Sequence, residues 1–153
     1  MKKTLSILFL IFLFTACKTD EEKDAERFIG MFGKSTWNIK KIVYYNDDAY
    51  STIDSTINFQ NSNIYFSEVC LPNSRICEGT QTIYGQTAKL QYDPKSYAYD
   101  RQVLFSTYDP TIKPIFTLQG TYDVEELDTN KRIFSGIVKA YEKNKWAKIY
   151  LEK

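Results

Sequence analysis

The chemistry open to this chain is limited first by a missing residue type, because none of its 153 residues is histidine. Catalytic triads and metal sites that need an imidazole are therefore excluded. Carboxylates remain, and Glu125 and Glu126, between Asp123 and Asp128, are candidates for a general acid/base pair or a calcium loop. Adjacent strand residues point to opposite faces and the calcium-loop order is missing, so we interpret this run as a solvated turn. We expect no catalytic residue, no metal and no cofactor, and predict that the protein is not an enzyme.

A second set of useful side chains lies in the segment Tyr97-Ala98-Tyr99-Asp100-Arg101. If this segment is a strand, Tyr97, Tyr99 and Arg101 share one face. Two aromatic rings beside a guanidinium can line the mouth of a ligand site or stack on a sugar. The alternative is a wet sheet edge with amphipathic tyrosines. These three residues are the candidate ligand-binding residues of the sequence.

The first seventeen residues have the order of an export signal. Two lysines follow the initiating methionine, residues 5–14 are almost all apolar, and Ala16 directly precedes Cys17. The apolar run is short for a bilayer-spanning helix, which needs about 20 residues. The segment resembles a bacterial lipoprotein signal peptide whose lipobox is residues 14–17. The resemblance implies cleavage after Ala16 and attachment of lipid, palmitate among it, to Cys17.

This resemblance also implies a domain organisation and a location. Residues 1–16 would be the signal peptide, residues 17–33 a lipidated charged tether with a short helix, and residues 34–153 the folded domain. The membrane would be a partner through the lipid on Cys17. Lys18 followed by acidic residues is similar to the export signal of surface lipoproteins, and the alternative is a plain solvated tether. We therefore expect an outer-membrane location, with the cell surface slightly favoured over the periplasmic face.

If Cys17 carries lipid, Cys70 and Cys77 are the two cysteines that remain. Outside the cytoplasm such a pair is exposed to oxidising conditions. The Pro-Asn-Ser sequence at residues 72–74 is strong turn chemistry. We predict a disulfide across a loop between two strands. The alternative is a metal or redox pair, which the spacing and the missing histidine disfavour.

The sequence pattern predicts that the elements carrying these candidate residues are mostly strands. The chain has 12 Tyr and 10 Phe, and residues of this kind fit a pleated, half-buried surface. Without the two signal-peptide lysines, 18 basic residues face 19 acidic ones, so we expect no nucleic-acid partner. A helical pattern covers residues 20–31, and from Thr36 onward the period is two. The pattern predicts a bulge near residues 40–41 and a hairpin turn at residues 61–63.

Eight or nine short strands joined mostly by tight turns predict an all-β, antiparallel barrel or sandwich. The segment from Phe32 to Ile39, with Gly33 before Trp37, resembles the opening of a lipocalin-like domain. That resemblance implies an up-and-down barrel of 8–9 strands after a short N-terminal helix, with Trp37 as the core residue that closes one end. The alternative is an open β-sandwich.

Together these features predict a non-catalytic, lipid-anchored envelope protein. An eight-stranded barrel has an interior that can just hold one small ligand. We therefore expect a small apolar or amphipathic ligand inside the barrel. The alternative is a protein-interaction module, such as an accessory subunit of an envelope complex, an adhesin or a hydrolase inhibitor.

Overall fold

One helix and ten strands make up the part of the chain that the computed structural model describes, which is residues 19–72, 74–95, 101–107, 116–140 and 143–153. The elements are α2 (Asp20–Phe32), β1 (Ser35–Tyr45), β2 (Ile53–Asn58), β3 (Asn63–Cys70), β4 (Cys77–Ile83), β5 (Gln86–Asp93), β6 (Gln102–Thr107), β7 (Phe116–Thr117), β8 (Gly120–Asp128), β9 (Lys131–Ala140) and β10 (Lys143–Glu152). Among the described residues, no helix has the length and hydrophobicity that crossing a membrane requires.

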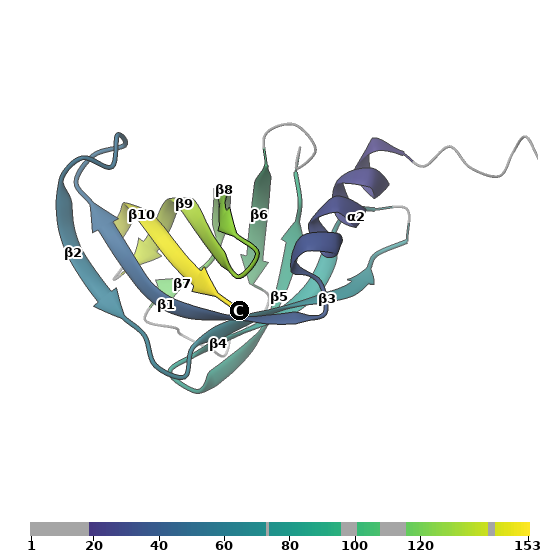
Figure 1. Cartoon of the computed structure of the whole chain (residues 1–153), viewed down its shortest axis with the longest axis horizontal. Coiled ribbons are helices and arrows are strands. Elements are labelled where there is room, and N and C mark those ends of the chain that lie inside the picture. The colour runs from purple at the N-terminus through teal and green to yellow at the C-terminus, as the bar shows by residue number, and fades with distance from the viewer. Residues whose placement is uncertain (1–18, 73, 96–100, 108–115, 141–142) are drawn as a thin grey trace, which may run out of the picture.

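The strands close into an antiparallel barrel (Figure 1). Neighbouring strands pair in the order β1, β3, β4, β5, β6, β8, β9 and β10, and β10 returns to pair with β1. The closing seam is long, because β10 pairs with β1 from Asn38↔Glu152 to Tyr45↔Trp146. Closure satisfies strand edges that a sandwich would leave open. The fold is therefore the up-and-down barrel that the sequence predicts, and not the open sandwich.

The hairpin turn predicted at residues 61–63 is wrong. Both β2 and β3 run antiparallel to β1, β3 along Ser35–Asn38 and β2 along Lys41–Tyr45. They are two pieces of one strand course, and residues 59–62 are the break between them. The backbone N–H of Phe59 donates to the carbonyl of Lys40 at 3.0 Å, which keeps the break against β1. Turn-forming residues favour a kink as readily as a hairpin, so local chemistry could not separate the two.

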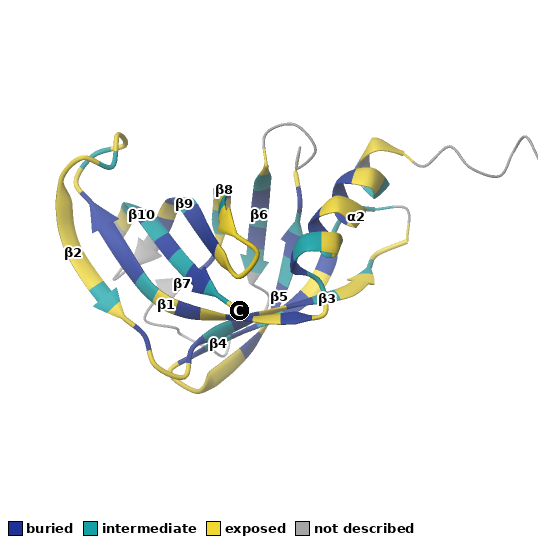
Figure 2. Ribbon diagram, in the orientation of Figure 1, coloured by how far each residue is buried: buried dark blue, intermediate teal, exposed yellow. Residues whose placement is uncertain are grey.

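A bulge in β1 is confirmed where the sequence predicts it. The register with β10 shifts between Ile39 and Lys41. The extra residue changes the inward-facing row from Trp37 and Ile39 to Ile42 and Tyr44, all of which are buried. Beyond the bulge, β1 continues beside β2, whose residues are mostly exposed (Figure 2).

Helix α2 closes one end of the barrel. Phe28 and Phe32 are completely buried and stack on each other at 4.4 Å between ring centroids. Phe28 contacts Phe66 of β3 at 5.2 Å, and Phe32 contacts Phe134 of β9 at 5.7 Å. Phe66 and Phe134 also meet each other across the barrel, at 6.5 Å. The rings of the helix and of opposite walls therefore form one continuous core.

Trp37 lies at the same end, completely buried. Its indole N–H donates to the carbonyl oxygen of Phe32 at 3.4 Å, which joins the end of α2 to β1. The guanidinium of Arg132 lies 5.3 Å from the indole ring and 5.6 Å from the ring of Phe32. One terminal nitrogen of the Arg132 guanidinium also donates to the carbonyl oxygens of Asp128 and Lys131, which ties the side chain to the β8–β9 turn, whereas its buried Nε has no hydrogen-bond partner among the described residues. Trp37 is thus a buried residue at the end of the barrel that α2 closes.

The disulfide between Cys70 and Cys77 is confirmed, and it closes the connection from β3 to β4.

Candidate functional site: an aromatic groove on the outer wall

The barrel interior, where the sequence places a ligand, is a packed core in its described part. The inward positions of β4, including Cys77 and Gln81, are all buried. Rings from different strands contact each other inside, among them Phe105 with Tyr122 at 5.7 Å. Two buried polar atoms in this interior, the hydroxyl of Tyr122 and Oε1 of Gln81, have no hydrogen-bond partner among the described residues. Burial raises the pKa of Tyr122, and the nearby Tyr44 raises it further.

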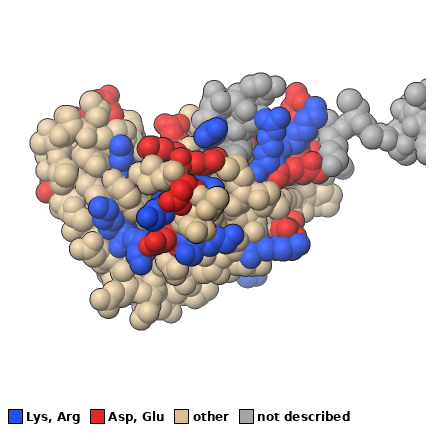
Figure 3. All heavy atoms as spheres, viewed as in Figure 1, with Lys and Arg blue, Asp and Glu red and all other residues tan. Residues whose placement is uncertain are grey.

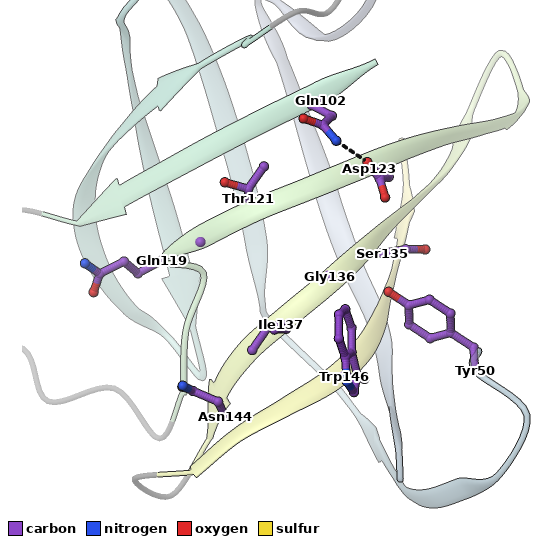
Figure 4. Close-up of a pocket in the computed structure, with 11 residues that line it drawn as sticks. Tyr50, Gln102, Gln119, Thr121, Asp123, Ser135, Gly136, Ile137, Asn144 and Trp146 are labelled. Carbon is purple, nitrogen blue, oxygen red and sulfur yellow. Dashed lines mark hydrogen bonds between the residues drawn. The ribbon is translucent and has the colours of Figure 1, made fainter. Parts of the chain in front are cut away.

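A groove of about 450 Å³ lies instead on the outer wall (Figure 4). Its position follows from strand alternation. Tyr122 and Gly136 are cross-strand partners that face inward, so the next pair, Asp123 and Ser135, faces outward. Trp146 pairs with Ile137 on the same outer face. The groove is lined by Tyr50, Gln102, Gln119, Gly120, Thr121, Asp123, Ser135, Gly136, Ile137, Asn144 and Trp146.

One side of the groove is apolar and aromatic. Trp146 of β10 stands between Ile137 of β9 and Tyr50 of the β1–β2 loop (Figure 4). Tyr50 meets Trp146 edge to face, with 6.0 Å between ring centroids, and meets Tyr45 in the same way at 5.2 Å. Ile137 is 41% exposed, which is high for a large apolar side chain. Exposed aromatic and aliphatic surface grouped in a hollow is typical of ligand sites.

The loop between β1 and β2 holds Tyr50 over the outer wall. The carboxylate of Asp47 accepts hydrogen bonds from the backbone N–H groups of Ser51 and Thr52, both at 2.9 Å, and from the Ser51 hydroxyl at 3.0 Å. These donors hold the pKa of Asp47 below its usual value, with the backbone bond from Ser51 the largest cause. Tyr50 itself has a left-handed φ of 54°, and the Lys148 ammonium lies 4.9 Å from its ring centroid. The hydrogen bonds of Asp47 therefore fold the backbone of the loop, and the contact of the Tyr50 ring with Lys148 holds the loop against the outer wall.

The other side of the groove is polar. The side-chain amide of Gln102 donates to one carboxylate oxygen of Asp123 at 2.8 Å. The second oxygen of Asp123 points on toward Ser135 and Tyr50 (Figure 4). Burial raises the pKa of Tyr50, and the charge of Asp123 raises it further, so the phenol stays neutral at physiological pH. A fixed carboxylate acceptor thus lies near hydroxyl groups that can both donate and accept.

Of the residues that the sequence singles out for ligand binding, Arg101 is described, and it is not among the residues that line this groove. Tyr97 and Tyr99 lie outside the described residues, as does Cys17. Arg101 precedes β6, and its guanidinium lies 3.8 Å from the carboxylate of Glu126. Glu126 and its neighbour Glu125 belong to β8 and not to a turn, which corrects that part of the sequence interpretation.

Sequence reasoning missed Trp146, Tyr50 and Asp123. One signal was present: in the strand near the C-terminus, Ala147 and Ile149 are the inward residues, which places Trp146 outward. A tryptophan on the outer face of a barrel strand is unusual enough to mark a site. Nothing local to Tyr50 shows that its loop returns to the wall of β10.

Within the described ranges, no group of three or more cysteine, aspartate or glutamate side chains is placed to hold a metal ion. The aromatic side and the polar side of the groove together form a hollow that can bind a ligand. Comparison with known proteins finds no family model, no curated protein and no solved structure that matches this chain.

Proposed function

We propose that this protein is a non-catalytic, lipid-anchored protein of the outer membrane that binds a small amphipathic ligand in the outer groove. The ligand class that fits best has a flat apolar face and several hydroxyl groups, as a sugar ring has. The observation that carries the proposal is the pairing of Trp146 and Tyr50 on one side of the groove with the fixed carboxylate of Asp123 on the other.

The chemistry of the two sides sets the expected specificity. The C–H face of a sugar ring can pack on the Trp146 ring while two neighbouring hydroxyls donate to Asp123. Asp123 is the one charged residue among the described residues that line the groove, and Lys148, whose ammonium lies over the Tyr50 ring, is not among them. A neutral sugar is therefore preferred over a uronic acid, whose carboxylate Asp123 would repel. The groove is open, and we expect affinities of about the millimolar to micromolar range.

The two tryptophans provide a test with a built-in control. Trp146 lines the groove, whereas Trp37 is buried under α2. In a ¹H–¹⁵N spectrum of the soluble domain, titration with neutral mono- and disaccharides should shift the Trp146 indole signal and leave that of Trp37 unchanged. A ligand inside the barrel would instead move the Trp37 signal, since its ring belongs to the interior cluster.

Trp146→Ala should weaken binding at least tenfold, about 1.4 kcal/mol. Tyr84→Ala is the matched control, because Tyr84 is also an exposed aromatic residue, 49% exposed, and lies away from the groove. Saturable binding that survives Trp146→Ala, or no response of either indole to any sugar tested, would contradict the groove as a saccharide site.

The membrane address is supported by the lipobox resemblance at residues 14–17. Cys17→Ser should move the protein from the membrane fraction to the soluble fraction, and intact mass should show loss of the lipid. Proteolysis of whole cells tests which face of the outer membrane carries the domain. Persistent membrane association of the serine variant would contradict lipidation of Cys17.

A second function, protein interaction, is favoured by the free edge of β2. Among the described strands, β2 pairs with β1 only, and Ile53 at its start is 61% exposed. An open strand edge can accept an extended segment of a partner by main-chain hydrogen bonds. Hydrogen exchange of the β2 amides that point away from β1 decides this: they should be protected in isolated outer membranes and unprotected in the purified domain, whereas the β2 amides bonded to β1 should be protected in both. Equal exchange in both states would remove this second function.

A further inference from the structure

The position of α2 fixes where a lipid on Cys17 would lie. Phe28 and Phe32 anchor the helix in the barrel end, both completely buried. At its start, the Thr19 backbone N–H donates to the Glu22 carboxylate at 2.9 Å, and the Thr19 hydroxyl accepts from the Glu22 backbone N–H at 3.3 Å. Two peptide units join Cys17 to Thr19, so their Cα atoms are at most about 8 Å apart. A lipid surface that holds Cys17 is therefore close to this end of the barrel.

The connection from β3 to β4 lies at the same end of the molecule as the start of α2 (Figure 1). Apolar side chains at the end of β3 and at the start of this connection are turned to solvent: Val69 is 62% exposed, Leu71 is 42% exposed, and Pro72 is exposed as well. The disulfide between Cys70 and Cys77 and the hydrogen bond from the Leu71 N–H to the Ile76 carbonyl, at 2.8 Å, hold the loop in shape. A rigid loop loses little conformational entropy when it inserts into another phase.

The charges around this loop are balanced. Lys34 pairs with Glu68, directly before Val69, at 2.7 Å. Lys and Arg side chains are interspersed with Asp and Glu over the helix and the barrel end beside it (Figure 3). Such a surface has no preference for anionic lipid, so insertion of the loop must depend on its apolar side chains.

We infer that Val69 and Leu71 insert into the interfacial layer of the lipid surface that carries the Cys17 anchor. This inference rests on the lipidation proposed above. The short link between Cys17 and Thr19 supplies proximity, and the two side chains supply apolar area that is costly to leave in water. The α2 end of the barrel thus faces the membrane. The loop that joins the paired strands β1 and β2 lies at the other end of the molecule and faces away from the membrane.

The test places a fluorescent reporter in the loop of the lipidated full-length protein. Leu71→Trp and, separately, Val69→Trp are reconstituted in phosphatidylcholine vesicles with and without brominated acyl chains. Ile53→Trp is the matched control, because Ile53, at the start of β2, is an apolar residue as exposed as Val69. The added emission from the two loop variants should shift to the blue and lose intensity with brominated lipid, to a depth of about 5–10 Å. The control should do neither.

Unquenched emission from both loop variants, in protein whose lipid is shown by intact mass, would overturn the inference and leave the anchor intact. Equal quenching of Ile53→Trp would overturn the orientation. A parent protein without lipid on Cys17 would overturn both the anchor and the inference that rests on it. Vesicles with added phosphatidylglycerol should give the same quenching, and a strong dependence on anionic lipid would contradict an apolar insertion.

Discussion

Tyr92 and Tyr122 both place a hydroxyl group in the core, but the two hydroxyls differ in hydrogen bonding. The Tyr92 hydroxyl donates to the carbonyl of Ser67, whereas that of Tyr122 has no partner among the described residues. A buried polar group without a partner costs about 1–3 kcal/mol, and a satisfied one contributes about 1 kcal/mol. The same Tyr→Phe substitution therefore has opposite signs at the two positions.

Tyr122→Phe should raise the free energy of unfolding by about 1 kcal/mol, because it removes an unsatisfied hydroxyl and keeps the ring. Tyr92→Phe should lower it by about 1–2 kcal/mol, because the Ser67 carbonyl loses its donor. Urea unfolding of both variants beside the parent measures the pair. A loss of stability in Tyr122→Phe would show that its hydroxyl has a partner.

The same two tyrosines predict the response to alkali. Burial raises the pKa of both phenols, so the folded state keeps its protons after the unfolded state has lost them. Stability is then full below the unfolded pKa of about 10 and falls as the pH rises above it. Unfolding free energy from pH 8 to 12, with tyrosinate absorbance as a second reading, should show this fall. Tyr92→Phe and Tyr122→Phe should each make it less steep, and an unchanged slope in both would contradict the assignment.

At the scale of elements, alternation of side chains predicted most of the barrel. The bulge at Lys41, the inward row through Trp37 and the loop between Cys70 and Cys77 follow from local pattern. The break at residues 59–62 does not, because pairing partners decide whether turn residues make a hairpin or a kink. The groove was missed for a similar reason. It is assembled from the β1–β2 loop and from four strands, β6, β8, β9 and β10, whose register only the closed barrel fixes.

The β1–β2 loop depends on one carboxylate. Asp47→Ala removes the acceptor of the Ser51 and Thr52 backbone N–H groups, so Tyr50 should lose its place beside Trp146. We expect weaker sugar binding, a smaller shift of the Trp146 indole on titration and little change in global stability. Calorimetric titration and thermal unfolding measure the two effects. Full binding in Asp47→Ala would show that Tyr50 is dispensable.

Protonation of Asp47 should have the same effect as its removal. Its pKa is lower in the folded loop than in the unfolded chain, so its contribution is complete above the unfolded value of about 4 and is lost as the pH falls through the folded pKa. The Ser51 and Thr52 amide resonances should therefore move in acid below about pH 4. In Asp47→Asn they should not titrate, and titration that persists in this variant would assign the effect to another group.

The disulfide is an element-scale constraint as well. Cys70 and Cys77 are seven residues apart, and in the chain-entropy model closing so short a loop contributes about 2.5 kcal/mol. The double variant Cys70→Ser/Cys77→Ser should have a free energy of unfolding, measured with urea, that is lower by about that amount. The barrel should stay closed. Equal stability of the parent with and without reductant would contradict a structural role.

At the scale of the whole molecule, α2 (Asp20–Phe32), which lies in the segment expected to be a tether with a short helix, packs into the barrel end as part of the domain. If Cys17 carries the proposed lipid, one residue, Lys18, separates this anchor from the helix cap at Thr19. The sequence left open whether residues 20–31 close the domain or belong to the tether, since their modest apolar face fits both. Two partners of that face, Phe66 and Phe134, are far away in the chain, and only closure of the barrel brings them to one end.

If α2 and the barrel are one unit, they must unfold together. Phe28→Ala and Phe32→Ala should each lower the free energy of unfolding by about 3–5 kcal/mol. The double variant should lose less than the sum, because the two rings contact each other at 4.4 Å. Helical circular dichroism and Trp37 fluorescence should give one coincident transition in the parent and in each single variant. Ile29→Ala, on a partly buried position of the same helix, is the milder control. Separate transitions, or a variant without α2 that melts like the parent, would show that the helix does not belong to the cooperative unit of the barrel.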